Sequence, residues 1–212
     1  MPVILMPLGF VRGIMPVGLL LAAFLLLTAC AGQQTWASDE AVSAARHVHG
    51  GAPELTLVTI MHHRSGNGHH TALFINGAER VLFDPAGSWH LDAAPERNDL
   101  HYGMTSAIGA SFYLSHVRET HYAVVQRLRV TPDVAAQAMA LAQQAGPVGP
   151  ARCAISTSAL LRALPGFDAI GSNWHPHRLM QDFAQLPGVI TVELHHDDPD
   201  VLQKAYQAQA PL

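Results

Sequence analysis

Apolar and polar positions along the chain separate into short strand-like runs and longer helix-like runs. The strand-like runs are rich in β-branched, aromatic and aliphatic residues and are bounded by Gly, Pro or Asn. They fall at residues 54–61, 70–75, 80–84, 121–130 and 187–194. Apolar residues at helical spacing define four further segments, at residues 132–145, 153–164, 172–186 and 198–208. This pattern predicts an α+β fold in which a small antiparallel sheet packs against helices.

The most informative stretch is residues 68–89, which predict a β-hairpin followed by a chain reversal. The run HTALFI is one strand, Asn76-Gly77 is a strong turn dipeptide, and RVLFD is the second strand. Pro85, Ala86 and Gly87 then end that strand. Residues 85–120 have weak periodicity and several turn signals, and no element is assigned to them.

Two polar residues of this hairpin are candidates for catalysis. With a three-residue loop at 76–78, His70 lies opposite Asp84, and facing residues of a hairpin are within side-chain reach. A two-residue Asn-Gly turn would pair His69 with Asp84 instead, and His90 is an alternative partner for His70. An imidazole held by a carboxylate is the base and the orienting group of a nucleophilic triad.

Cys153 is the candidate nucleophile. It follows a turn rich in Gly and Pro at 146–150 and begins an apolar helical stretch that stops at Pro165. The partial positive charge of a helix N-terminus favours the thiolate, which is the reactive form. The chain has two cysteines, so Cys153 has no disulfide partner if Cys30 is modified. The alternative role is a small buried residue on an apolar helix face.

The N-terminus predicts export and lipid attachment. A single Arg12 precedes the apolar run GIMPVGLLLAAFLLLTAC, which is the layout of a secretory signal. Its ending, LTAC, resembles a bacterial lipobox, in which Cys30 is lipidated and becomes the first mature residue. We therefore expect a signal peptide at 1–29, a lipid-anchored linker at 30–53 and one domain at 54–212. The alternative is an uncleaved membrane anchor, and Ala31 after the cysteine indicates an outer-membrane destination.

Charge and histidine content bear on the possible partners. A net charge of −4 without a Lys/Arg cluster argues against a nucleic-acid partner. The chain has 14 histidines, and three or four of them converging would bind zinc or copper. Their spacing matches no named zinc motif, so we expect no metal or other cofactor. The paired histidines stand at 62–63, 69–70, 175 and 177, and 195–196.

The order His70, Asp84, Cys153 carries a resemblance to known enzymes. A histidine entering a strand, an acidic residue on the next strand and a cysteine opening a helix resemble the circularly permuted papain-like proteins. These include the permuted NlpC/P60-type hydrolases and the lecithin-retinol acyltransferase-like proteins. The pattern HTALFI...VLFDPAG is also similar to the adenovirus-type cysteine proteases, which have an oxyanion-hole glutamine where this chain has Gly146.

The resemblance implies a permuted papain-like arrangement and thiol-dependent acyl chemistry. Cys153 would attack an acyl carbon, His70 would act as its base, and Asp84 would orient the imidazole. The expected substrate is a peptide or cell-wall amide within reach of a membrane-anchored lipoprotein in the envelope, on the periplasmic side of the outer membrane. Two alternatives remain open, which are a non-catalytic envelope lipoprotein that binds a partner and a histidine-rich metal-binding protein.

Overall fold

Seven strands form one antiparallel sheet in the computed structural model, which describes residue 32 and residues 34–212. The strands lie in the order β4-β5-β3-β2-β1-β6-β7. Their bounds are β1 Glu54–His62, β2 Gly68–Asn76, β3 Arg80–Phe83, β4 Glu96–Arg97, β5 Leu100–His101, β6 His121–Arg129 and β7 Ile190–Leu194. The strands predicted from hydrophobic patterning are all present, and the two short strands β4 and β5 are additions at one edge.

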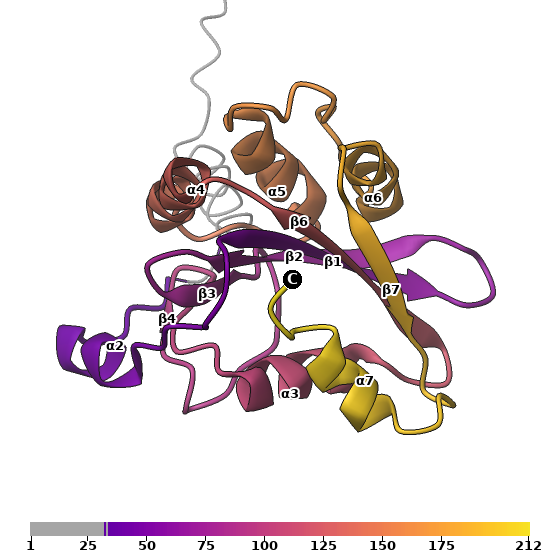
Figure 1. Cartoon of the computed structure of the whole chain (residues 1–212), viewed down its shortest axis with the longest axis horizontal. Helices are drawn as coiled ribbons and strands as arrows, with labels where there is room; N and C mark the ends of the chain where they lie inside the picture. The colour runs from indigo at the N-terminus through magenta and orange to yellow at the C-terminus, as the bar shows by residue number, and fades with distance from the viewer. Residues whose placement is uncertain (1–31, 33) are drawn as a thin grey trace, which may run out of the picture. The chain divides into compact units, whose positions relative to one another are not determined.

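Helices cover both faces of this sheet (Figure 1). The six helices of the described residues are α2 Asp39–Ala45, α3 Ser106–His116, α4 Pro132–Gln144, α5 Cys153–Arg162, α6 Pro176–Ala184 and α7 Val201–Gln207. α4, α5 and α6 lie over one face, and α3 and α7 lie over the other. The predicted α+β class is confirmed.

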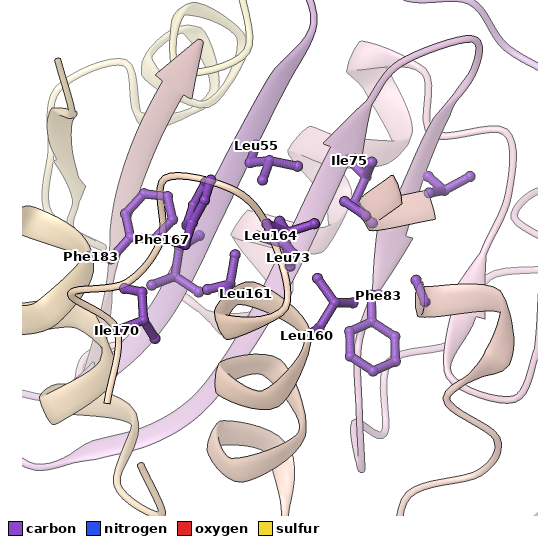
Figure 2. Packing of buried hydrophobic residues seen from close by; sticks show 14 of the residues in the cluster. Leu55, Leu73, Ile75, Phe83, Leu160, Leu161, Leu164, Phe167, Ile170 and Phe183 are labelled. Atoms are coloured by element: carbon purple, nitrogen blue, oxygen red, sulfur yellow. The ribbon is translucent and has the colours of Figure 1, made fainter. Parts of the chain in front are cut away.

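The alternation of side chains along the strands divides the core into two layers. Leu73 and Ile75 of β2 pack with α5 and α6, whereas Ala72 and Phe74 pack with α3. Figure 2 shows the first layer, in which the leucines of α5 face β2 and β3. Because both faces are covered, β1 is buried along nearly its whole length, including its polar threonines. Successive residues of the central strands therefore point into two different buried layers, and neither face of the sheet is left to solvent there.

The helix starts that position the site follow from local sequence. Thr131 caps α4 by accepting the Val134 N–H at 3.3 Å, and Pro132 occupies the first turn, as predicted. α5 begins at Cys153, also as predicted, and no side chain caps it. The first backbone N–H groups of α5 are consequently left for other acceptors.

The segment before β1 does not behave as the expected spacer. Residues 34–53 include α2 and pack along the β4 edge, where Ala37 N–H donates to the Glu96 carbonyl at 2.9 Å. His47 and His49 also contact the domain. The His47 carbonyl accepts from Arg80 N–H at 2.8 Å, and His49 Nε2 lies 2.8 Å from the Gln209 carbonyl.

The predicted signal peptide and Cys30 lie outside the described residues. Within those residues no helix has both the length and the apolar character to cross a membrane.

Candidate active site

The β2–β3 hairpin brings His70 and Asp84 together, but in a different register from the one expected. Asn76 pairs with Arg80, so the loop consists of residues 77–79, and Ile75 faces Val81 where Glu79 was expected. Both predicted registers were wrong. The actual register is displaced by two residues from the three-residue prediction, and a shift of two keeps each side chain on the same face. His70 Nε2 therefore still reaches Asp84 Oδ1, at 2.5 Å.

Asp84 is held by the chain reversal that follows β3. Its N–H donates to the Asp99 carbonyl at 2.8 Å, and its carbonyl accepts the Gly87 N–H at 3.0 Å. The side chain is buried. A Cβ at Gly87 would lie 2.0 Å from Asp84 Oδ2 and 2.3 Å from Cγ. Only glycine at this position leaves room for the carboxylate in its observed place.

Cys153 approaches the pair around an open edge of β2. α5 lies on the Leu73 face of the sheet, whereas His70 continues the Ala72 face. The last β2–β3 pair is Leu73 with Phe83, so β3 does not cover the start of β2. The N-terminus of α5 occupies this gap, where the thiol interacts with the His70 imidazole and with the backbone N–H groups of Thr71 and Ala154. The three predicted site residues thus come together.

The electrostatics of the three groups favour a charged arrangement. Burial alone would lower the pKa of His70, but the Asp84 carboxylate and the Cys153 side chain raise that pKa to about 10. Burial alone would raise the pKa of the Cys153 thiol, but His70 and the N–H groups of Thr71 and Ala154 lower it. The pKa of Asp84 is also lowered, because His70 outweighs the cost of burial. Near neutral pH these directions favour thiolate, imidazolium and carboxylate.

Ring geometry assigns the two nitrogens of His70. Nε2 is engaged by Asp84, so Nδ1 is the nitrogen left for the thiol. The imidazole is 16% exposed and Cys153 is 6% exposed. The thiol is therefore shielded but lies beside a partly accessible base.

Asp99 connects Asp84 to the turn that leads into α5. Asp99 Oδ2 accepts the Val148 N–H at 2.7 Å, while its carbonyl accepts the Asp84 N–H. Its backbone is in the left-handed region, with φ of 65°. Burial, aided by the charges of Glu96 and Asp84, raises the pKa of Asp99 to about 6. Sequence patterning did not single out this residue, because it lies in the unassigned stretch 85–120.

His116 was also missed as a site residue. Its ring stacks on His70 with the centroids 6.0 Å apart and the planes 12° apart. It belongs to the last turn of α3, a helix that the sequence pattern did not predict. His90, the alternative orienting residue, instead lies 3.3 Å from Asp92 and does not bond His70.

Trp174, which precedes α6, does not lie in the core. It is 58% exposed on the connection between α5 and α6. The Arg152 guanidinium, on the residue before Cys153, lies 6.0 Å from the centre of its ring. An exposed aromatic side chain therefore stands on the α5 side of the site.

Three other histidines lie close together at one end of the sheet. His62, His69 and His121 have ring centroids 4.5 to 5.4 Å apart. Across the described part of the chain, no group of three or more His, Cys, Asp or Glu is placed to hold a metal ion.

Comparison with known proteins adds no relative from which a function could be transferred. A scan against protein-family models and searches of curated proteins and solved structures found no match to the chain. The function is therefore argued from the geometry of Cys153, His70 and Asp84.

Proposed function

We propose that this chain is a thiol-dependent acyl hydrolase with a permuted papain-like site, in which Cys153 is the nucleophile. The observation that carries the proposal is the alignment of Cys153, His70 and Asp84. One ring nitrogen of His70 is held at 2.5 Å by a buried carboxylate, and the ring also interacts with the thiol at the start of α5. Nucleophile, base and orienting group in series are the parts that covalent acyl transfer requires.

In the first half of the reaction, the Cys153 thiolate attacks the carbonyl carbon of an amide or ester. The carbonyl oxygen becomes an oxyanion, and the C–N or C–O bond then breaks. The His70 imidazolium gives its proton to the leaving amine or alkoxide, so a neutral product departs and an acyl-thioester remains. Asp84 keeps the imidazole oriented through both proton positions.

In the second half, water attacks the thioester carbonyl. His70, now neutral, takes a proton from the water, the C–S bond breaks, and a carboxylic acid leaves with the thiolate restored. The backbone N–H groups at the start of α5 are the candidate oxyanion donors, since no side chain caps that helix. Ala154 N–H already interacts with the sulfur, which supports it as one of them.

The proposed substrate is a peptide or cell-wall amide. This part of the proposal depends on the lipobox-like sequence at Cys30, which would tether the enzyme to the envelope membrane, facing the periplasm. The residues 34–53 that follow pack on the domain, so the tether would hold the domain close to that membrane.

The proposal is tested by trapping the acyl-enzyme. The protein is incubated with a p-nitrophenyl acyl ester, and the intact mass and the peptide map are measured. We expect one acyl group on Cys153, its absence in Cys153→Ser, and slower formation in His70→Ala. The matched control His63→Ala removes an exposed histidine of the β1–β2 loop and should acylate at the rate of the wild type. Acylation elsewhere, or equal rates in His70→Ala and wild type, would contradict the proposal.

The non-catalytic alternative makes a different prediction about the same residues. A lipoprotein that only binds a partner has no need for a thiol beside a charged imidazole, and it predicts a Cys153 that lies far from His70. The opposite pKa shifts that Cys153 and His70 cause in each other support the enzyme. If Cys153 proved unreactive in the folded protein, partner binding would become the better account.

A further inference from the structure

A cleft opens on the α3 side of His70, and its lining is basic. It has a volume of about 700 Å³ and lies between the start of β2, residues 86–90 and the connection from α3 to β6. Its ionisable lining is five imidazoles and one guanidinium: His69, His70, His90, His116, His121 and Arg118. None of the described residues that line it carries a carboxylate, although the chain has a net charge of −4.

Arg118 supplies the permanent positive charge of this cleft. Its Nε and Nη2 donate to the Ser115 carbonyl at 3.1 and 2.8 Å, which fixes the guanidinium. Its backbone exchanges two hydrogen bonds with His121, at 2.9 and 3.0 Å, so the turn is tight. Nη1 has no hydrogen-bond partner among the described residues, and its N–H groups stay available to a ligand.

The carboxylates nearest to this lining do not occupy the cleft. Glu119 follows Arg118 in the chain but lines only a neighbouring cleft, to which Arg118 also contributes, and it forms no ion pair with Arg118. Asp92 pairs with His90 at 3.3 Å and is fully exposed. Asp84 is buried beneath His70. The guanidinium therefore has no carboxylate partner of its own in the described part of the chain.

His116 gives the cleft a group that can accept a proton. Its Nδ1 donates to the Phe112 carbonyl at 2.8 Å and lies 3.0 Å from the Ser115 hydroxyl. Nε2 consequently carries no proton while the ring is neutral. Burial lowers the pKa of His116, with help from the charges on His70 and Arg118, while the Phe112 carbonyl and Asp84 oppose that shift. An anion in the cleft would favour protonation of this ring.

We propose that this cleft binds a carboxylate group of a ligand. Arg118 is its main partner, and the hydroxyl groups and imidazoles that line the cleft are additional donors. A guanidinium presents a planar fork that suits a carboxylate. One permanent cation matches one negative charge, whereas a phosphate dianion usually meets several cations or a helix N-terminus. This inference rests on the proposed function for its biological role, in which the substrate is a peptide with a free carboxylate near the scissile amide.

The test uses the Cys153→Ala variant, which cannot form an acyl-enzyme, so binding is measured apart from chemistry. N-acetyl-alanyl-alanine and its C-terminal amide are titrated while the imidazole signals are followed by NMR. We expect the acid to bind at least about tenfold more tightly than the amide, with the largest shifts at His116 and His121. Affinity for the acid should rise as the pH falls from about 7.5 to about 6, since bound anion and ring protonation favour each other.

Two variants and one further ligand complete the test. Arg118→Gln should remove the preference for the acid. Arg162→Gln removes the same charge at an exposed position of α5, across the sheet from the cleft, and should keep the preference. Equal binding of acid and amide, no shift at about 10 mM acid, tighter binding of inorganic phosphate, or equal losses in both variants would overturn the proposal. The binding titration does not require the Cys153 thiol. Its result therefore tests carboxylate binding even if the acylation test fails.

Discussion

The charge on His70 is set by neighbours on opposite sides of its ring. Asp84 and Cys153 raise the pKa of His70 to about 10, above its ordinary value of ~6.5. The stabilisation from this imidazolium is therefore full below pH ~6.5 and is lost as pH rises through about 10. The lowered pKa of Asp84 matters at acidic pH. The stabilisation from its carboxylate is complete above pH ~3.9 and is lost as the pH falls through the folded-state pKa of Asp84.

Ionisation of Asp99 affects the stability of the folded state in the opposite direction. Its pKa is raised to about 6, so ionisation costs the folded state stability as pH rises from ~3.9 through about 6. Asp99→Asn keeps an oxygen for the Val148 N–H and cannot ionise. We expect this variant to be more stable than the wild type at pH 7 by about 1 kcal/mol, after allowance for partial exposure.

The measurement is urea unfolding of both proteins at several pH values. The difference between them should vanish near pH ~3, about one unit below the ordinary Asp pKa of ~3.9, where Asp99 is protonated in both states. A wild type that is as stable as Asp99→Asn at pH 7, or more stable, would show that the charged carboxylate is favourable in its place.

At the scale of the element, the chain reversal after β3 fixes the carboxylate. Gly87→Ala would place a Cβ 2.0 Å from Asp84 Oδ2, so the carboxylate would have to leave its observed place. We expect Asp84 to move away from His70 and the alkylation rate of Cys153 at pH 7 to fall by about tenfold. Gly50→Ala is the matched control, because a Cβ there meets nothing within 4 Å. Equal alkylation rates in both variants would mean that Asp84 does not set the state of the thiol.

The hairpin shows which part of the site could be read from sequence. The prediction that His70 and Asp84 share a face required a three-residue loop, because a two-residue turn would have paired His69 with Asp84, and the observed loop has three residues. The register was not predictable, because Asn76-Gly77 is compatible with several loop lengths and the observed loop also takes in Glu79. The start of α5 at Cys153 was predictable from the Gly-Pro turn before it.

At the scale of the whole molecule, a buried ion pair joins the two central strands to the C-terminal segment. Arg127 of β6 donates to both carboxylate oxygens of Glu54 at 2.8 Å and also to the Ala210 carbonyl. Glu54→Ala would leave a buried guanidinium without its anion. We expect a loss of roughly 3–5 kcal/mol in unfolding free energy, measured by urea denaturation.

A control separates this effect from simple loss of a surface charge. Glu119→Ala removes a carboxylate from the exposed turn between α3 and β6 and should change stability by less than about 1 kcal/mol. A Glu54→Ala protein as stable as this control would show that the pair contributes little to the fold.

The parts of the site that sequence did not predict depend on tertiary packing. α3 has apolar residues on most of its surface and therefore no clear helical stripe, so the 85–120 stretch gave no element and His116 was overlooked. The placement of Asp99 beside Val148 joins residues far apart in the chain. The exposure of Trp174 likewise depends on how α5 and α6 pack, which the composition of that connection does not reveal.

The central claim is that His70 activates the Cys153 thiol, and the pH dependence of Cys153 alkylation by iodoacetamide tests it most directly. In the wild type the rate should stay high well below the ordinary thiol pKa of ~8.5, because the imidazolium and two N–H groups stabilise the thiolate. In His70→Ala the midpoint should move up toward or above that value, while His63→Ala should match the wild type. A thiol that reacts only after denaturant is added, or a midpoint unchanged by His70→Ala, would contradict the account.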